Sequence, residues 1–202
     1  TIRKTLELIP KIKKHIGNEN KMADFILSDN SKLSIKTNIN NNRKVCPQNI
    51  GQISKEKFIK LFGNNNDNIK DLIFRKIAIL LRMYLDNTFI CEHTVWIYKK
   101  NNIYQSKIFN KNFISNKIFD NDQISFSKSL EDWKESITVK YKNVSIGEFQ
   151  IHSNRNIVKF RFNLDKLLSI LDDVYHIRGA DLERNYLSNS NKKSKIIYQK
   201  NT

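Results

Sequence analysis

Residues 23–37, ADFILSDNSKLSIKT, hold two short apolar runs separated by a polar turn. The second run alternates, with Leu33 and Ile35 standing between polar side chains. Such alternation predicts a β-strand, and Ser, Asp and Asn between two runs of this kind predict a tight turn. We therefore expect a β-hairpin over residues 21–37.

Three polar side chains of this hairpin are predicted to converge at one of its ends. Asp24 begins the first strand, and Ser34 and Lys36 stand two residues apart on the second, so Ser34 and Lys36 project from one face. A carboxylate holds Mg²⁺ against a phosphate, and a nearby lysine orients water and neutralises developing charge. The hairpin therefore predicts metal-assisted phosphodiester cleavage, although a polar hairpin on a basic protein also carries such residues without any catalysis.

The charge of the chain points to a polyanionic partner. Its 202 residues include 36 Lys and Arg but 20 Asp and Glu, which gives a net charge of +16. An AT-rich genome also favours codons for Asn, Lys and Ile. Codon bias therefore explains part of the excess of Lys. Basic residues recur in nearly every segment, and no segment pairs a clean apolar face with a basic one. A nucleic acid is therefore expected in preference to a membrane surface.

Other compositional features exclude several classes of protein. Two cysteines and four histidines make neither a disulfide framework nor a zinc cluster, which fits a reducing cytoplasm. Five glycines form no phosphate-binding motif. The longest apolar stretch, 77–81, is too short to cross a bilayer, and no secretory signal is visible, although the initiating Met is absent. We expect a single domain over residues 1–202 with a polar tail over about 185–202.

The spacing of apolar residues predicts a mixed α/β fold with a central mixed β-sheet flanked by helices. We expect helices over the first sixteen residues, from Ser54 as N-cap, over 69–85 with Asp67 as N-cap, and over 164–171. Beyond the hairpin, strands are expected over 90–98, 103–109, 137–141, 144–151 and 157–162. The strands over 137–141 and 144–151 are expected to pair.

The hairpin also resembles the catalytic hairpin of the PD-(D/E)XK nucleases, and among them the type II restriction endonucleases. The resemblance lies in Ala23-Asp24, nine intervening residues, and Ser34-Ile35-Lys36, and it covers roughly residues 2–62. It implies a restriction-endonuclease-like core and Mg²⁺-dependent hydrolysis, with Asp24 as the principal metal ligand and Lys36 as the catalytic lysine. Ser34 stands where the family has Glu or Asp, and Ala23 stands where it has Pro.

This departure leaves a second carboxylate to be found. Some restriction enzymes of the family have Ser or Thr at this position and take the missing glutamate from the next helix, where this chain has Glu56. The gap from Lys36 to Glu56 is longer than that variant normally shows. Glu19 and Glu7 are the further candidates, in that order, for completing the metal shell.

Two further segments are candidates for contacts with DNA. The segment 43–52 is rich in groups that bond phosphates and base edges, and the strands over 148–162 place Lys159 and Arg161 on a predicted outer face. The predicted DNA-binding residues are Arg43, Lys44, Gln48, Asn49, Gln52, Lys159 and Arg161. For the outer face, an ordinary solvated sheet surface is an equally good interpretation.

The resemblance implies cleavage of double-stranded DNA at a specific sequence. A homodimer is expected, because a two-fold dimer places one active site on each strand of a palindrome. Three alternatives remain open: a DNA-binding protein without catalysis, such as a replication or partition factor; a structure-selective nuclease of the same fold; and an RNA-binding or RNA-processing factor.

Overall fold

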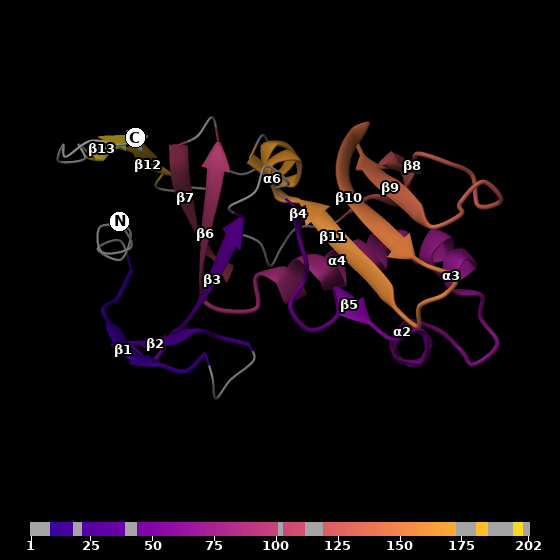
Figure 1. The fold of residues 1–202 in the computed structure, drawn as a ribbon, viewed down its shortest axis with the longest axis horizontal. Helices are drawn as coiled ribbons and strands as arrows, with labels where there is room; N and C mark the ends of the chain where they lie inside the picture. Colours follow the sequence, from indigo (N-terminus) through magenta and orange to yellow (C-terminus); the bar gives the residue numbers. More distant parts are fainter. Residues whose placement is uncertain are drawn as a thin grey trace. The chain divides into compact units, whose positions relative to one another are not determined.

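The computed structural model describes residues 9–17, 22–38, 44–100, 103–111, 119–172, 181–185 and 196–199 (Figure 1). The chain divides into two compact units, each built from separate segments of sequence. Unit 1 comprises residues 1–43, 89–115 and 175–202, and unit 2 comprises residues 44–88 and 116–174. The chain therefore passes between the units four times. The prediction of one nuclease domain stays a prediction.

Unit 1 is built on a seven-stranded sheet with the order β1-β2-β3-β6-β7-β12-β13. Its strands are β1 (Ile12–His15), β2 (Phe25–Leu27), β3 (Lys32–Asn38), β6 (His93–Lys100), β7 (Ile103–Asn110), β12 (Asp181–Asn185) and β13 (Ile196–Gln199). Strands β3 and β6 are parallel, whereas the other neighbours are antiparallel. The sheet is therefore mixed, as predicted. Strand β13 lies within the segment that was predicted to be a polar tail.

The hairpin of β2 and β3 is confirmed, and its turn explains why it forms. The Asp29 carboxylate accepts hydrogen bonds from the backbone N–H and the hydroxyl of Ser31, at 3.0 and 2.6 Å. Asn30 has a φ of 65°, a left-handed conformation that Asn tolerates better than most residues. The backbone N–H of Leu27 then donates to the carbonyl of Ser31 at 2.9 Å and closes the turn.

The predicted helix over the first sixteen residues is wrong where the structure describes it. Residues 12–15 form β1, which pairs with β2 through Ile12–Leu27 and His15–Phe25, with a bulge between them. Residues 1–8 lie outside the described part of the chain. The apolar spacing that indicated a helix instead places Ile9 and Ile16 in the buried interior. Pairing with the neighbouring hairpin thus overrides a weak local preference.

The two faces of the unit 1 sheet have different characters near the hairpin. On one face, Leu33 of β3 and Val95 of β6 belong to an apolar cluster with Leu27. The opposite face of the same strands carries Ser34 next to Thr94, and Lys36 next to Trp96. Strand β6 is buried at Val95 and Trp96, so it runs through the interior of the unit.

Four helices with described bounds lie in unit 2. They are α2 (Lys55–Phe62), α3 (Ile69–Arg75), α4 (Ile77–Thr88) and α6 (Leu164–Asp172). The Ser54 side chain accepts from the N–H of Lys57 and caps α2, which confirms the predicted start of this helix.

The single helix predicted over 69–85 is instead two helices. The chain departs from helical geometry at Lys76, where φ is −114° and ψ is 20°. The ammonium of Lys76 donates to the carbonyl of Phe62 at 2.8 Å, a tertiary contact that fixes this junction. The N-cap of α3 is Asn68 rather than Asp67, because the Asp67 carboxylate accepts from the N–H of Asn64 and from Arg75.

The sheet of unit 2 is antiparallel, with the order β4-β11-β10-β9-β8, and β5 also pairs with β11. Its strands are β4 (Lys44–Val45), β5 (Gln52–Ile53), β8 (Ile124–Phe126), β9 (Ser136–Tyr141), β10 (Val144–Ile151) and β11 (Val158–Asn163), and a short 3₁₀ turn, η2 (Asn121–Gln123), precedes β8. The predicted pairing of β9 with β10 is confirmed. In the core, Tyr84 of α4 stacks on Phe160 of β11 with ring centroids 4.4 Å apart. Trp133 is buried in this unit.

The architecture is α+β with a mixed sheet, in agreement with the predicted class. Among the described residues, no helix is long and apolar enough to cross a membrane.

Candidate active site

The candidate site lies where β2 begins beside β3, within unit 1. Phe25 pairs with Leu33, so Asp24 stands opposite Ser34 across the hairpin. The backbone N–H of Asp24 donates to the carbonyl of Leu33 at 2.9 Å, and Asp24 Oδ2 accepts from the N–H of Ile35 at 2.6 Å. The hairpin thus brings the acid of the first strand to the middle of the Ser34–Lys36 segment.

Ser34 and Lys36 differ in their surroundings although they share a face of β3. Ser34 is only 3% exposed and stands beside Thr94 of β6. Lys36 is half-buried beside Trp96, whose indole N–H donates to the side chain of Asn38 at 2.9 Å. A hydroxyl at the Ser34 position is therefore enclosed by protein, whereas the lysine retains some access to solvent.

Cys91 lies close to both charged residues of the site. Its thiol donates to the carbonyl of Met22 at 3.0 Å. Burial, with the negative charge of Glu92 as the next cause, raises the pKa of the Cys91 thiol to about 11. The charges of Asp24 and Lys36 act on the same thiol in opposite directions. Without a bound cation, the Cys91 thiol is therefore protonated at neutral pH.

Glu92 is an acid near the site that sequence reasoning missed. It precedes β6, and its Oε2 accepts from the backbone N–H of Lys32 at 2.8 Å. Burial acts to raise the pKa of Glu92, but hydrogen bonds from backbone N–H groups, that of Lys32 above all, hold it below its usual value. The sequence placed Glu92 in a predicted strand over 90–98, but nothing local indicates that this strand lies beside β3.

The predicted second carboxylates lie in unit 2 or outside the described residues. Glu7 and Glu19 belong to undescribed segments. Glu56 lies in the first turn of α2 in unit 2, where both carboxylate oxygens are 2.9 Å from the amide nitrogen of Asn156. This bond lowers the pKa of Glu56. The role of each of the three acids stays a prediction.

Asp24 nevertheless suits a divalent metal. Its Oδ2 is occupied by Ile35, whereas Oδ1 accepts no hydrogen bond within the described part of the chain. Mg²⁺ usually keeps several waters and binds through one or two carboxylates together with substrate phosphates. One available carboxylate oxygen therefore fits such an ion, although across the described ranges no three His, Cys, Asp or Glu side chains are grouped to hold a metal.

The predicted DNA-contacting segment 43–52 is largely fixed against the edge of the unit 2 sheet; Arg43 lies outside the described residues. Strands β4 and β5 flank a short loop and both pair with β11. Two hydrogen bonds hold the loop. The N–H of Phe160 donates to the carbonyl of Gly51 at 2.7 Å, and the side chain of Asn87 accepts from the N–H of Asn49 at 2.8 Å. A Cβ at Gly51 would lie 2.4 Å from the carbonyl of Pro47, so this path requires glycine.

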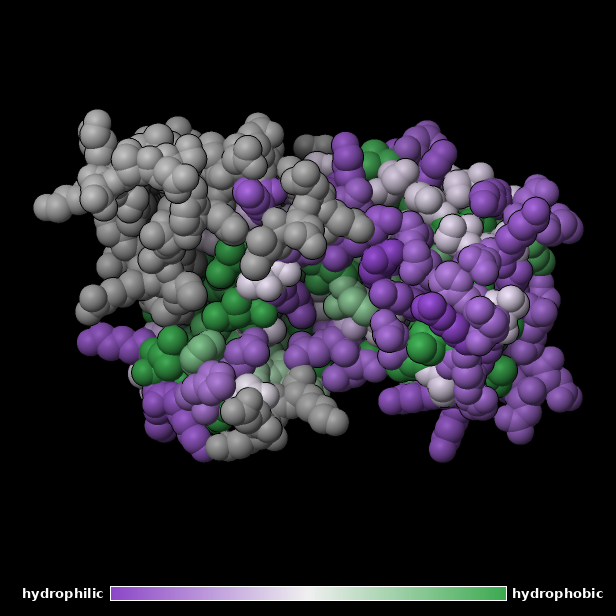
Figure 2. All heavy atoms as spheres, in the orientation of Figure 1, coloured by the Kyte–Doolittle hydropathy of each residue, from purple (hydrophilic) through white to green (hydrophobic). Residues whose placement is uncertain are grey.

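Glu148 neutralises two of the predicted DNA-binding cations. Its carboxylate lies 2.5 Å from the ammonium of Lys44 and 3.0 Å from the guanidinium of Arg161, and it also accepts from Gln150. Burial acts to raise the pKa of Glu148, but the bonds from Lys44 and Arg161 hold it below its usual value. Lys159 stands opposite Gln52 and Gln150 in the same sheet. Hydrophilic side chains dominate this part of the molecule in Figure 2.

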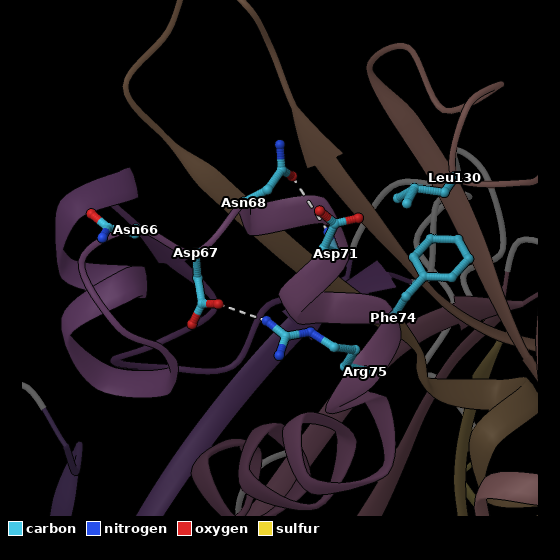
Figure 3. A pocket seen from close by; sticks show the side chains of 7 residues that line it. All are labelled: Asn66, Asp67, Asn68, Asp71, Phe74, Arg75 and Leu130. Atoms are coloured by element: carbon cyan, nitrogen blue, oxygen red, sulfur yellow. Dashed lines mark hydrogen bonds and ion pairs between the residues drawn. The ribbon is translucent and has the colours of Figure 1, made fainter.

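A surface hollow of about 550 Å³ lies elsewhere in unit 2, around the start of α3 (Figure 3). Asp67 and Arg75 form an ion pair of 2.6 Å at its edge, and Phe74 lies on another side. Its lining is Asn66, Asp67, Asn68, Asp71, Phe74, Arg75 and Leu130. None of the predicted site residues lines this hollow, so the hairpin remains the candidate site.

Comparison with known proteins finds one relevant similarity. The chain is 33% identical over 183 residues to the type II restriction enzyme CviAII of Paramecium bursaria Chlorella virus 1. The match covers 87% of this chain but 52% of the viral enzyme, so the chain spans about half the length of that relative. No family model matches the chain, and no solved structure matches it significantly. The similarity is therefore to a named restriction enzyme along most of the present sequence.

Proposed function

We propose that this chain is a sequence-specific endonuclease of the type II restriction class, which hydrolyses phosphodiesters of double-stranded DNA with Mg²⁺. The observation that carries the proposal is its 33% identity to a type II restriction enzyme over most of its length. The arrangement of Asp24 beside Ser34 and Lys36 supports the same class of chemistry.

In this proposal, the mixed sheet of unit 1 is a restriction-endonuclease-like core. Support comes from the antiparallel succession of β1, β2 and β3 and from the parallel addition of β6 next to β3. This order places the acid-bearing start of β2 beside the strand that carries the lysine.

The residues of the hairpin have separate roles in the proposed reaction. Asp24 Oδ1 holds the metal ion, which when bound supplies positive charge against the scissile phosphate and lowers the pKa of water. The Lys36 ammonium binds a phosphate oxygen and orients the attacking water. Ser34 occupies the usual position of the second acid without supplying a carboxylate, and Glu56 or Glu19 supplies additional charge.

The excess of cations serves to hold the duplex. Phosphate contacts give affinity and orientation, whereas contacts to base edges give specificity. We assign these contacts to Arg43, Lys44, Gln48, Asn49, Gln52, Lys159 and Arg161. A homodimer acting in the cytoplasm completes the proposal, because a palindromic site needs one active centre for each strand.

The test is cleavage of long mixed-sequence duplex DNA by the purified chain with Mg²⁺. Discrete fragments are expected, and Asp24→Ala and Lys36→Ala should each abolish them. Lys32→Ala is a matched control, since it removes another lysine of the same strand and should retain cleavage.

A DNA-binding protein without catalysis is the second candidate, and the charge of +16 favours it. It predicts salt-sensitive retention of DNA with no cleavage under any divalent metal. Cuts that depend on branched DNA, rather than on sequence, would instead indicate a structure-selective nuclease.

A further inference from the structure

His15 and Gly17 lie beside the available carboxylate oxygen of Asp24. The backbone N–H of Ile16 donates to the carbonyl of Asp24 at 2.9 Å, which aligns the end of β1 with the start of β2. His15 precedes this bond and Gly17 follows it. The chain after β1 is thereby held against the residue proposed to bind metal.

The missing side chain of Gly17 leaves a space that His15 and Asp24 share. A Cβ at Gly17 would lie 3.0 Å from His15 Nε2 and 3.7 Å from Asp24 Oδ1. A nitrogen ligand and an oxygen ligand therefore border the same small volume. Gly17 has no positive φ, so its backbone conformation does not itself require glycine.

Neither ligand atom is occupied within the described part of the chain. Asp24 Oδ2 binds the N–H of Ile35, which leaves Oδ1 on the side of Gly17. The imidazole of His15 is exposed, and its contact is with the ring of Phe25 at a centroid distance of 5.0 Å. Packing on Phe25 orients the imidazole without using its nitrogens.

We propose that His15 and Asp24 form a two-ligand site for a divalent cation over Gly17. The inference rests on the proposed metal-dependent function and deepens it, because His15 supplies a ligand where Ser34 offers no carboxylate. The carboxylate suits Mn²⁺ as well as Mg²⁺, and the imidazole adds a nitrogen ligand of the kind that first-row transition-metal ions take. Waters and substrate phosphates complete the coordination.

The test measures binding of Mn²⁺ alone to the full chain, by electron paramagnetic resonance and calorimetry without DNA. Asp24→Asn should abolish binding, and His15→Ala should weaken it by at least about tenfold. Gly17→Ala should weaken it similarly, because the added methyl group fills the shared space while both ligands remain. His93→Ala is the matched control, since it removes another histidine of the unit 1 sheet. Circular dichroism checks the fold of each variant.

The outcomes separate the two proposals. If Asp24→Asn loses Mn²⁺ while His15→Ala and Gly17→Ala bind like His93→Ala, this inference is overturned and the proposed role of Asp24 stands. If the unmodified chain binds no Mn²⁺ without DNA, the two-ligand site is overturned, whereas the metal role of Asp24 is judged separately, by whether Asp24→Ala abolishes DNA cleavage with Mg²⁺. Weaker or absent Mn²⁺ binding in Asp24→Asn, His15→Ala and Gly17→Ala, with normal binding in His93→Ala, supports the inference.

Discussion

The carboxylate of Asp24 accepts a hydrogen bond from the backbone N–H of Ile35 at 2.6 Å, across the hairpin of β2 and β3. This bond has a structural purpose as well as the proposed chemical one, because it satisfies a part-buried donor of β3. The two purposes can be separated, since an amide oxygen also accepts hydrogen bonds but is a poorer ligand for Mg²⁺.

We expect Asp24→Asn to abolish cleavage while it lowers the free energy of unfolding by less than about 1 kcal/mol, because the acceptor for Ile35 is retained. Asp24→Leu should cost about 1–3 kcal/mol, because it leaves that N–H unpaired. Urea titration and DNA cleavage measure the two effects. A stable Asp24→Asn variant with full cleavage would show that the carboxylate is structural only.

Ser34→Glu tests whether the Ser34 position lies within reach of the metal. Because Ser34 is buried opposite Asp24, a carboxylate there should destabilise the fold by on the order of 3 kcal/mol without metal. Millimolar Mg²⁺ or Mn²⁺ should restore part of this loss, since binding to the native state stabilises it. Thermal unfolding with and without metal measures the effect, and Ser34→Gln is the uncharged control. Equal responses of the two variants to metal would contradict the prediction.

Glu148→Gln should increase affinity for DNA and steepen its salt dependence. The substitution removes a carboxylate that pairs with Lys44 and Arg161, so less of the positive charge on this part of the sheet is neutralised. Each phosphate contact adds about 0.9 to the slope of log affinity against log salt. Titrations at several salt concentrations measure this slope.

Asp86→Asn is the control for Glu148→Gln, because among the described residues Asp86 pairs only with Arg82, at 2.9 Å on α4. The loss of one negative charge is the same in both variants. An equal gain in affinity would show that the Glu148 cluster contributes only through net charge.

Cys91 should resist alkylation at neutral pH. The residue is 2% exposed, and burial raises the pKa of its thiol to about 11, so the reactive thiolate becomes abundant only near that pH. In a Cys46→Ser background, Cys91 is the sole thiol of the chain. Iodoacetamide labelling followed by mass spectrometry should be slow at pH 7–8 in the native chain and fast in denaturant. Fast native labelling would place Cys91 outside the interior.

The hairpin was predictable from sequence because its determinants are local. The turn around Asp29 and Asn30 and the alternation through Leu33 and Ile35 act over a few residues. The cap at Ser54 was predictable for the same reason. At β1, by contrast, pairing with β2 decides the conformation, and at Lys76 a hydrogen bond to the carbonyl of Phe62 does so. Neither contact is indicated by the local sequence.

The candidate site was predictable only in part. Asp24, Ser34 and Lys36 belong to one hairpin, so their proximity follows from sequence. Glu148 lies 104 residues from Lys44 along the chain, and their ion pair depends on how β4 meets β11. The space at Gly17 depends on how β1 ends beside Asp24. Relationships of this kind arise from tertiary packing and need the structure.

The parallel pairing of β3 with β6 also has a consequence for the order of folding. Lys32 at the start of β3 bonds Glu92, which directly precedes β6 and is 60 residues away in sequence. A hairpin closes in about 1–10 μs, whereas non-local pairing must first overcome the entropy of closing a long loop. Asp24 and Lys36 can therefore meet early, but Ser34 gains its buried surroundings only when β6 arrives. During synthesis, the candidate site remains incomplete until the ribosome has released β6.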